Sequence, residues 1–95
     1  MTWNASVNAT ATYQRLIEAC NEFPFDLAKT FLVGKRVYTF EPDYVTHADG
    51  SITGDIFTVD QVQNVKRIEP FRIDANGKVT QNAPLKKFAR KLVNL

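Results

Sequence analysis

The sequence has few of the residues from which metal sites, disulfide scaffolds and nucleotide sites are built. Its 95 residues include one cysteine, Cys20, one histidine, His47, and four glycines. A single cysteine forms no disulfide within the chain, and a zinc site with one cysteine and one histidine would need several carboxylates. The glycines form neither a phosphate-binding loop nor a dinucleotide fingerprint. We therefore expect no metal site and no cofactor.

Long apolar runs and a targeting signal are missing as well. No apolar stretch approaches the roughly 18 residues of a membrane span. The start of the chain has neither a basic stretch nor an apolar segment after it. Residues 1–9 are small and polar, and we expect a flexible arm or an edge strand there. These features predict a cytoplasmic protein that does not enter a membrane.

What remains is the composition of an ordinary folded domain. Hydrophobic residues make up 44% and charged residues 23% of the 10.8 kDa chain, values that are typical of globular proteins. No repeat, linker or low-complexity stretch divides the sequence. The length therefore predicts a single domain over residues 1–95.

The charge is distributed unevenly along the chain. Residues 1–65 carry four basic and eight acidic side chains, a net charge of −4, whereas residues 66–95 carry eight basic and two acidic ones, a net charge of +6. Such asymmetry is a hint of an anionic partner. The alternative is that the two halves face each other in the fold or in an oligomer.

One or two helices are predicted before residue 35. Apolar residues recur at intervals of three and four from Tyr13 to Cys20, which is the pattern of a single buried helix face. Thr10 or Thr12 is expected to cap this helix at its N-terminus. Residues 25–34 predict a second, short helix, although this run is also apolar enough for a strand.

From Lys35 to about Gln81 the chain has the composition of an antiparallel sheet. Short runs of β-branched and aromatic residues favour strands, and Pro42 is expected to end the first of them. Between residues 58 and 65, apolar residues recur at every third position. That segment is interpreted as a strand with a bulge or, alternatively, as a helical turn.

Two dipeptides predict hairpins in this region. Asp49-Gly50 favours a two-residue loop that pairs His47 with Ile52. In that register one face holds Val45, His47, Ile52 and Ile56, and the other holds Tyr44, Thr46, Thr53 and Asp55. Asn76-Gly77 favours a three-residue loop with Gly77 left-handed, which pairs Ile73 with Val79.

The last segment predicts a helix that is apolar on one face and basic on the other. Its apolar residues follow helical spacing: Leu85, Phe88, Ala89 and Leu92. Its basic residues occupy the opposite face: Lys86, Lys87, Arg90 and Lys91. Asn82 is the expected N-cap, and Pro84 is tolerated in the first turn.

These elements together predict an α+β fold. It has one or two N-terminal helices, a four- or five-stranded antiparallel sheet or a small SH3-like partly open barrel, and a basic amphipathic C-terminal helix. The SH3-like comparison concerns architecture alone, because no motif of that family occurs in the sequence.

No catalytic site is predicted. Nucleophilic catalysis would need His47 beside Cys20 with an orienting acid such as Asp55, and nothing in their spacing brings them together. Cys20 lies on the apolar face of the first helix, where we expect a buried and unreactive thiol. We therefore expect a protein that is not an enzyme.

The leading interpretation is a small accessory protein, bacterial or phage-like, that acts on a protein partner as an inhibitor or adaptor. An acidic hairpin face with Tyr44, Asp49 and Asp55 is its expected docking surface, and an exposed sheet edge is another. A homo-oligomer is compatible with this interpretation.

The alternative is a nucleic-acid-binding protein. Basic residues near the C-terminal third would then contact phosphates: Lys66, Arg67, Arg72, Lys86, Lys87, Arg90 and Lys91. The competing explanation is that these side chains only keep a packed helix and strand in contact with water.

Overall fold

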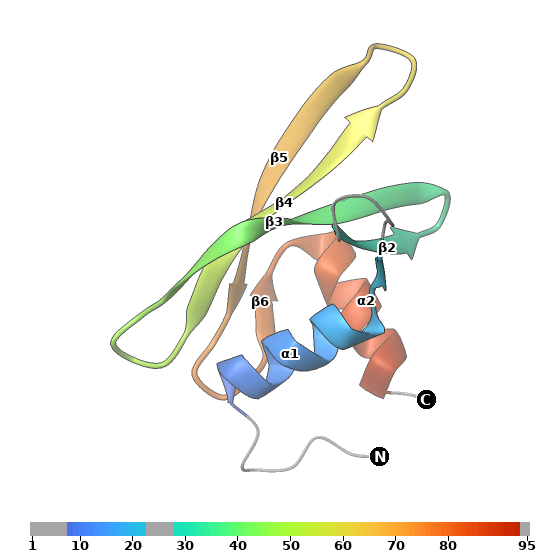
Figure 1. The fold of residues 1–95 in the computed structure, drawn as a ribbon. Helices are drawn as coiled ribbons and strands as arrows, with labels where there is room; N and C mark the ends of the chain where they lie inside the picture. The colour runs from blue at the N-terminus through green and yellow to red at the C-terminus, as the bar shows by residue number, and fades with distance from the viewer. Residues whose placement is uncertain (1–7, 23–27, 94–95) are drawn as a thin grey trace.

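The computed structural model describes residues 8–22 and 28–93, which form two helices and six strands (Figure 1). In chain order they are α1 Ala9–Ala19, β1 Asn21–Glu22, β2 Lys29–Val33, β3 Arg36–Thr46, β4 Ile52–Asp60, β5 Val65–Ile73, β6 Val79–Gln81 and α2 Ala83–Val93. The arm or edge strand expected over residues 1–9 falls mostly on residues 1–7, outside the described residues. Ala9 already belongs to α1.

The six strands form one antiparallel sheet in which each strand pairs with the next along the chain. The sheet is open, with β1 and β6 at its two edges. The predicted α+β class is confirmed, with a helix before the sheet and a helix after it. The predicted number of strands is too low, and the sheet does not close into a barrel.

Pro42 does not end the first long strand, contrary to the prediction. β3 continues through it to Thr46, and the register with β4 shifts between the pairs Phe40–Ile56 and Tyr44–Gly54. Four positions of β3 therefore span two positions of β4. Such a bulge leaves residues out of the hydrogen-bonded ladder, and so it accommodates a proline, which has no backbone N–H.

Residues 58–65 comprise the end of β4, a turn over residues 61–64 and the start of β5, so neither prediction holds for the whole segment. β4 ends at Asp60, β5 begins at Val65, and the chain reverses between them. The Asp60 carboxylate accepts hydrogen bonds from the backbone N–H groups of Val62 and Gln63, at 2.9 and 3.2 Å. Aspartate favours turns because its side chain bonds the backbone two residues on. The segment thus separates two long strands.

The second helix predicted over residues 25–34 is wrong where the structure describes it. Lys29–Val33 forms β2, which pairs with β3 through a tight turn at Gly34-Lys35. Residues 25–27 lie outside the described residues. Thr30, Phe31 and Val33 favour strands, and pairing with β3 places Phe31 in the core. The sheet context overrides the helical spacing of this run.

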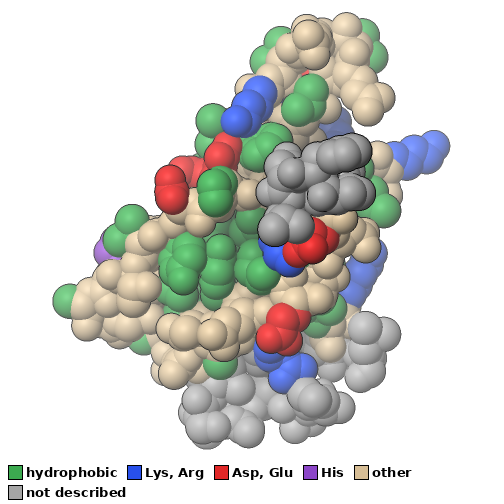
Figure 2. All heavy atoms as spheres, in the orientation of Figure 1, with side chains coloured by type: hydrophobic (Ala, Val, Ile, Leu, Met, Phe, Trp, Pro, Cys, Tyr) green, Lys and Arg blue, Asp and Glu red, His purple; other side chains and the backbone are tan. Residues whose placement is uncertain are grey.

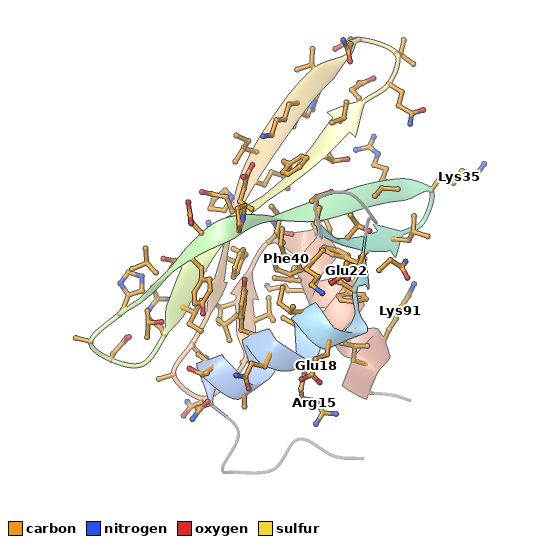
Figure 3. All side chains as sticks on the ribbon, in the orientation of Figure 1. Arg15, Glu18, Glu22, Lys35, Phe40 and Lys91 are labelled. Carbon is orange, nitrogen blue, oxygen red and sulfur yellow. The ribbon has the colours of Figure 1, made fainter. Side chains whose placement is uncertain are left out.

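The core lies between the sheet and the helices, which cover the same face of the sheet (Figure 1). We call this face the helix side and the opposite face the outer side. Buried strand residues define the helix side: Phe31, Tyr38, Phe40, Ile52, Ile56, Phe71 and Ile73. Phe40 lies between β3 and the helices (Figure 3). Because side chains alternate along a strand, their neighbours in sequence lie on the outer side.

Asn8, and not Thr10 or Thr12, caps the N-terminus of α1. The Asn8 side chain accepts a hydrogen bond from the Ala11 N–H at 2.9 Å. Thr12 is buried instead, and its hydroxyl donates to the Gly77 carbonyl at 2.7 Å, which ties α1 to the turn before β6. The predicted apolar face of this helix is confirmed by the residues that pack on the core: Tyr13, Leu16, Ile17 and Cys20.

α2 confirms the prediction for the C-terminal segment. The Asn82 side chain accepts a hydrogen bond from the Leu85 N–H at 3.0 Å and so caps the helix. Leu85 is fully buried, and the Phe88 ring stacks on Phe31 of β2 with ring centres 4.6 Å apart. Within the described residues, neither of the two 11-residue helices is long and apolar enough to cross a membrane.

The two predicted hairpins have different outcomes. The one at Asn76-Gly77 is confirmed, because Ile73 pairs with Val79 and Gly77 has a φ of 87°. The register predicted at Asp49-Gly50 is wrong by one residue. The His47 N–H donates to the Ser51 carbonyl at 2.8 Å, so the loop comprises residues 48–50.

This shift moves each β3 side chain of the hairpin to the other face. Tyr44 and Thr46 lie on the helix side with Ile52, the partner of Thr46. His47 lies on the outer side, where its Nε2 atom is 2.7 Å from the Thr53 hydroxyl. The side chains of β3 in this hairpin therefore lie on the faces opposite to those predicted, whereas the side chains of β4 lie on the predicted faces.

Gly54 provides a test of the packing on the helix side. A Cβ atom at this position would lie 2.7 Å from Cε2 of Phe71, which is buried against Tyr13 and Phe40. We expect Gly54→Ala to lower the free energy of unfolding by about 1–3 kcal/mol through overpacking. Asp55→Ala, at the exposed neighbouring position, is the control and should change it little. Equal stability of both variants in urea unfolding would contradict this packing.

Candidate functional site

The structure does not bring together the residues predicted to bind a protein partner. Tyr44 lies on the helix side, where its ring centre is 4.4 Å from that of Tyr13. Asp55, next to Gly54 on β4, is exposed on the outer side. Burial raises the pKa of Tyr13 to about 12, and the neighbouring Tyr44 contributes to this shift. Tyr44 and Asp55 therefore face opposite sides of the sheet.

Asp49, the third predicted residue, stabilises the β3–β4 loop. Its Oδ1 atom accepts hydrogen bonds from the Ser51 hydroxyl at 2.6 Å and from the Ser51 N–H at 2.9 Å. These bonds hold the pKa of Asp49 below its usual range. Its Oδ2 atom lies 3.5 Å from the Arg72 guanidinium. The contacts of Asp49 are thus those of a turn residue.

The seven predicted nucleic-acid contacts are also divided between surfaces. Lys66 and Arg72 lie on the outer side, and both form ion pairs, Lys66 with Glu41 and Arg72 with Asp49. Arg67 points to the helix side of the same strand. The four basic residues of α2 belong to the helix layer across the sheet: Lys86, Lys87, Arg90 and Lys91. Only these four form one continuous basic surface.

The outer side of the sheet carries a surface that the sequence did not predict. Leu32 pairs with Val37, Phe57 pairs with Ile68, and Val59 is two residues further along β4 than Phe57. The Thr58 hydroxyl donates to the Val37 carbonyl at 2.9 Å, so β3 and β4 remain adjacent there. Five apolar side chains from four neighbouring strands thus form the outer apolar band: Leu32, Val37, Phe57, Val59 and Ile68.

The aliphatic side chains of the outer apolar band are open to solvent, whereas Phe57 is partly buried and its partner Thr39 is buried. The exposed fractions of its aliphatic side chains are 52% for Leu32, 45% for Val37, 46% for Val59 and 56% for Ile68. They make up four of the eight large hydrophobic side chains that are exposed in the described part of the chain. Single exposed apolar residues are ordinary, whereas a contiguous group marks a binding surface or an aggregation hazard.

Charged residues border the outer apolar band at one end. Glu41 and Asp43 lie within the bulge of β3, on either side of Pro42, and Asp55 lies on the neighbouring strand. The Lys66 ammonium reaches from β5 across the band, 4.2 Å from the centre of the Phe57 ring and 3.0 Å from the Glu41 carboxylate. An ammonium over an aromatic face is attracted by the ring quadrupole. Lys66 therefore keeps Phe57 partly covered.

A signal for this surface was present in the sequence. The segment Ile56-Phe57 with Val59, and the segment Val37-Tyr38 with Phe40, place apolar residues at both even and odd positions. A sheet with one face in water shows strict alternation, whereas strands buried on both faces read as nearly continuous apolar runs. The sequence therefore indicates apolar residues on both faces of the sheet. It does not indicate the strand register that brings those of the outer side next to one another.

A hollow lies between α1 and β3, and Phe57 of the outer apolar band is part of its lining. Figure 2 shows hydrophobic side chains gathered at its floor. Its volume is about 430 Å³, and its described lining is mostly apolar: Tyr13, Ile17, Ala28, Lys29, Thr39, Phe40, Glu41, Pro42 and Phe57. The lining residue Lys29 forms an ion pair with Glu22. This lining offers no converging set of polar groups for a small ligand.

The residues considered for catalysis are engaged elsewhere. The Cys20 thiol lies 3.2 Å from the Leu16 carbonyl, to which it donates, and the His47 ring bonds Thr53. Cys20 is half-buried and not fully buried as expected. Burial raises the pKa of its thiol to about 11. Among residues 8–22 and 28–93, no three histidine, cysteine, aspartate or glutamate side chains gather as metal ligands.

Comparison with known proteins gives no relative. No known protein family, no curated protein and no solved structure matches this chain. The function is therefore inferred from the surfaces of the molecule described above.

The raised pKa of Cys20 predicts slow labelling of the native thiol. At pH 8 the thiolate fraction is about 100-fold lower than for a thiol of pKa 9.0, and only part of this loss is offset by the higher nucleophilicity of the thiolate. We expect labelling by a maleimide to be at least about 10-fold slower than in the urea-unfolded chain. The native rate should rise steadily up to about pH 11. Equal rates in both states would contradict the described environment.

Proposed function

We propose that this protein is a small, non-enzymatic protein-binding module and that the outer apolar band is its binding surface. The observation that carries the proposal is the half-exposed group Leu32, Val37, Val59 and Ile68 on the face opposite the helices. An aliphatic cluster of this kind, on the order of a few hundred Å², is typical of interaction sites. An inhibitor or adaptor would act through such a surface.

The setting of the band supports this proposal. It lies on paired strands, and the helices pack behind the part of the sheet that holds Phe31, Phe40 and Ile56, whereas the ends of β4 and β5 next to the Asp60 turn project beyond the helices (Figure 1). A rigid, preformed surface lowers the entropy that is lost on binding. The apolar centre with charged residues at its border also matches the arrangement of protein interfaces.

The predicted docking residues are revised accordingly. Asp55 remains part of the proposed surface, because it borders the outer apolar band together with Glu41 and Asp43. Tyr44 does not, because it packs on Tyr13 on the helix side. Asp49 lies beyond the band in the β3–β4 loop.

The proposal predicts which substitution abolishes partner capture. The immobilised protein is exposed to a lysate of its source organism, and the bound proteins are quantified by mass spectrometry. Ile68→Glu places a charge in the band and should lose the captured partner. Val62→Glu is the matched control, because Val62 is 95% exposed in the β4–β5 turn and outside the band. A partner retained by Ile68→Glu would contradict the proposed surface.

The nucleic-acid alternative has one observation in its favour. The basic residues of α2 form no ion pair with any acidic side chain in the described residues: Lys86, Lys87, Arg90 and Lys91. Unpaired cations along one helix face are the electrostatic requirement for binding phosphates. A gel-retardation assay with DNA and RNA at low and moderate salt separates this function from protein binding.

Replacement of the four basic residues of α2 by glutamine tests that alternative. The free energy of unfolding should change little, because exposed charges contribute little to stability. If the protein binds nucleic acid, the variant should bind more weakly, and the slope of log affinity against log salt should fall by about one for each phosphate that the variant no longer neutralises. Our proposal expects the variant to retain its protein partner. If the variant with the altered α2 no longer captured that partner, the proposed binding surface would be contradicted.

A further inference from the structure

Four neighbouring strands, β2 to β5, carry apolar side chains on both faces. β2 has Phe31 on the helix side and Leu32 on the outer side, and β4 has Ile56 and Phe57 in the same relation. Helices cover only one of these faces (Figure 1). Strands of this composition are typical of sheets with a second layer on the far face. The outer apolar band is therefore expected to have a covering layer.

The charges at the two ends of the band indicate what that layer is. Glu41, Asp43 and Asp55 lie at one end. At the other end, beyond the pair Leu32–Val37, Lys35 extends from the β2–β3 turn (Figure 3). Lys35 forms no ion pair with any acidic group of the described residues. The band thus has apolar side chains in its middle, where the Lys66 ammonium lies over the Phe57 ring, acidic groups at one end and Lys35 at the other.

Such a surface is complementary to itself. A two-fold axis that runs across the strands reverses the direction of the band in the second copy. The apolar middle of one copy then covers the apolar middle of the other, and the acidic end of each copy meets the Lys35 turn of its partner. A two-fold interface of this kind uses the same patch on both subunits. A foreign partner would need both charge types at matching positions.

We propose that the protein bound by the outer apolar band is a second copy of this chain, packed face to face as a sheet-on-sheet dimer. This inference rests on the proposed function and names its partner. The order of layers becomes helices, sheet, sheet and helices. Facing sheets pack about 10 Å apart with strands roughly aligned, so the aliphatic side chains of the two bands interdigitate.

The size of the band fits a weak or standard dimer. A standard interface buries about 800 Å² on each partner, of which somewhat more than half is apolar. Five side chains that expose on the order of a few hundred Å², together with the polar groups at both ends, approach this value. We therefore expect a dissociation constant in the micromolar range.

The test measures the mass of the purified full-length chain by sedimentation equilibrium from low micromolar to about 1 mM protein. We expect the mass to rise from 10.8 kDa to twice that value. Ile68→Glu on β5 and Leu32→Glu on β2 should each raise the dissociation constant by about 100-fold or more. Both side chains are about half exposed, so the variants should fold, which thermal unfolding of the monomers verifies.

Val62→Glu serves again as the matched control and should dimerise like the wild type, since Val62 lies in the turn outside the band. The proposal is overturned if the wild-type chain stays monomeric at about 1 mM. It is also overturned if a dimer forms whose dissociation constant neither band variant changes. A monomeric chain that still captures a foreign protein through Ile68 would overturn the dimer alone and leave the proposed function in place.

Discussion

The structure depends on the placement of both helices on one face of a six-stranded sheet. Rings from the helices and from three strands meet there, with Phe31 against Phe88 and Phe40 and Phe71 against Tyr13. Burial of these aromatic rings dominates the energy of the core. Because side chains alternate along a strand, the same packing leaves Leu32, Phe57 and Ile68 on the uncovered face.

Two local features decide what the uncovered face presents. The bulge around Pro42 keeps both Phe40 and Tyr44 on the helix side, and so Glu41 and Asp43 lie at the end of the outer apolar band. The turn after Asp60 returns the chain as β5 and brings Ile68 opposite Phe57. The bulge at Pro42 thus places the acidic residues at the border of the band, and the turn at Asp60 places Ile68 at its centre. Neither Pro42 nor Asp60 is itself part of the band.

The two side chains considered for catalysis lie in different parts of the fold. The Cys20 thiol has a raised pKa and bonds a helix carbonyl, while His47 bonds a threonine hydroxyl in a different part of the fold. The hollow between α1 and β3 has a mostly apolar lining. By contrast, the outer apolar band joins the four consecutive strands β2 to β5 into one surface. A face-to-face dimer would complete a sheet that already has apolar residues on both sides.

The sequence by itself determined the local elements whose signals lie within a few residues of each other. These include the apolar face of α1, the Asn82 cap and apolar face of α2, and the Gly77 turn. Tertiary structure alone decided the rest. Lys29–Val33 forms a strand because it pairs with β3. The sequence at Asp49-Gly50 allows a loop of two or three residues, and the pairing of His47 with Ser51 selects the three-residue loop and so sets the register. A shift of one residue in the register moves every side chain of a strand to the opposite face of the sheet. The outer apolar band therefore depends on the pairing between strands, which no local sequence pattern encodes.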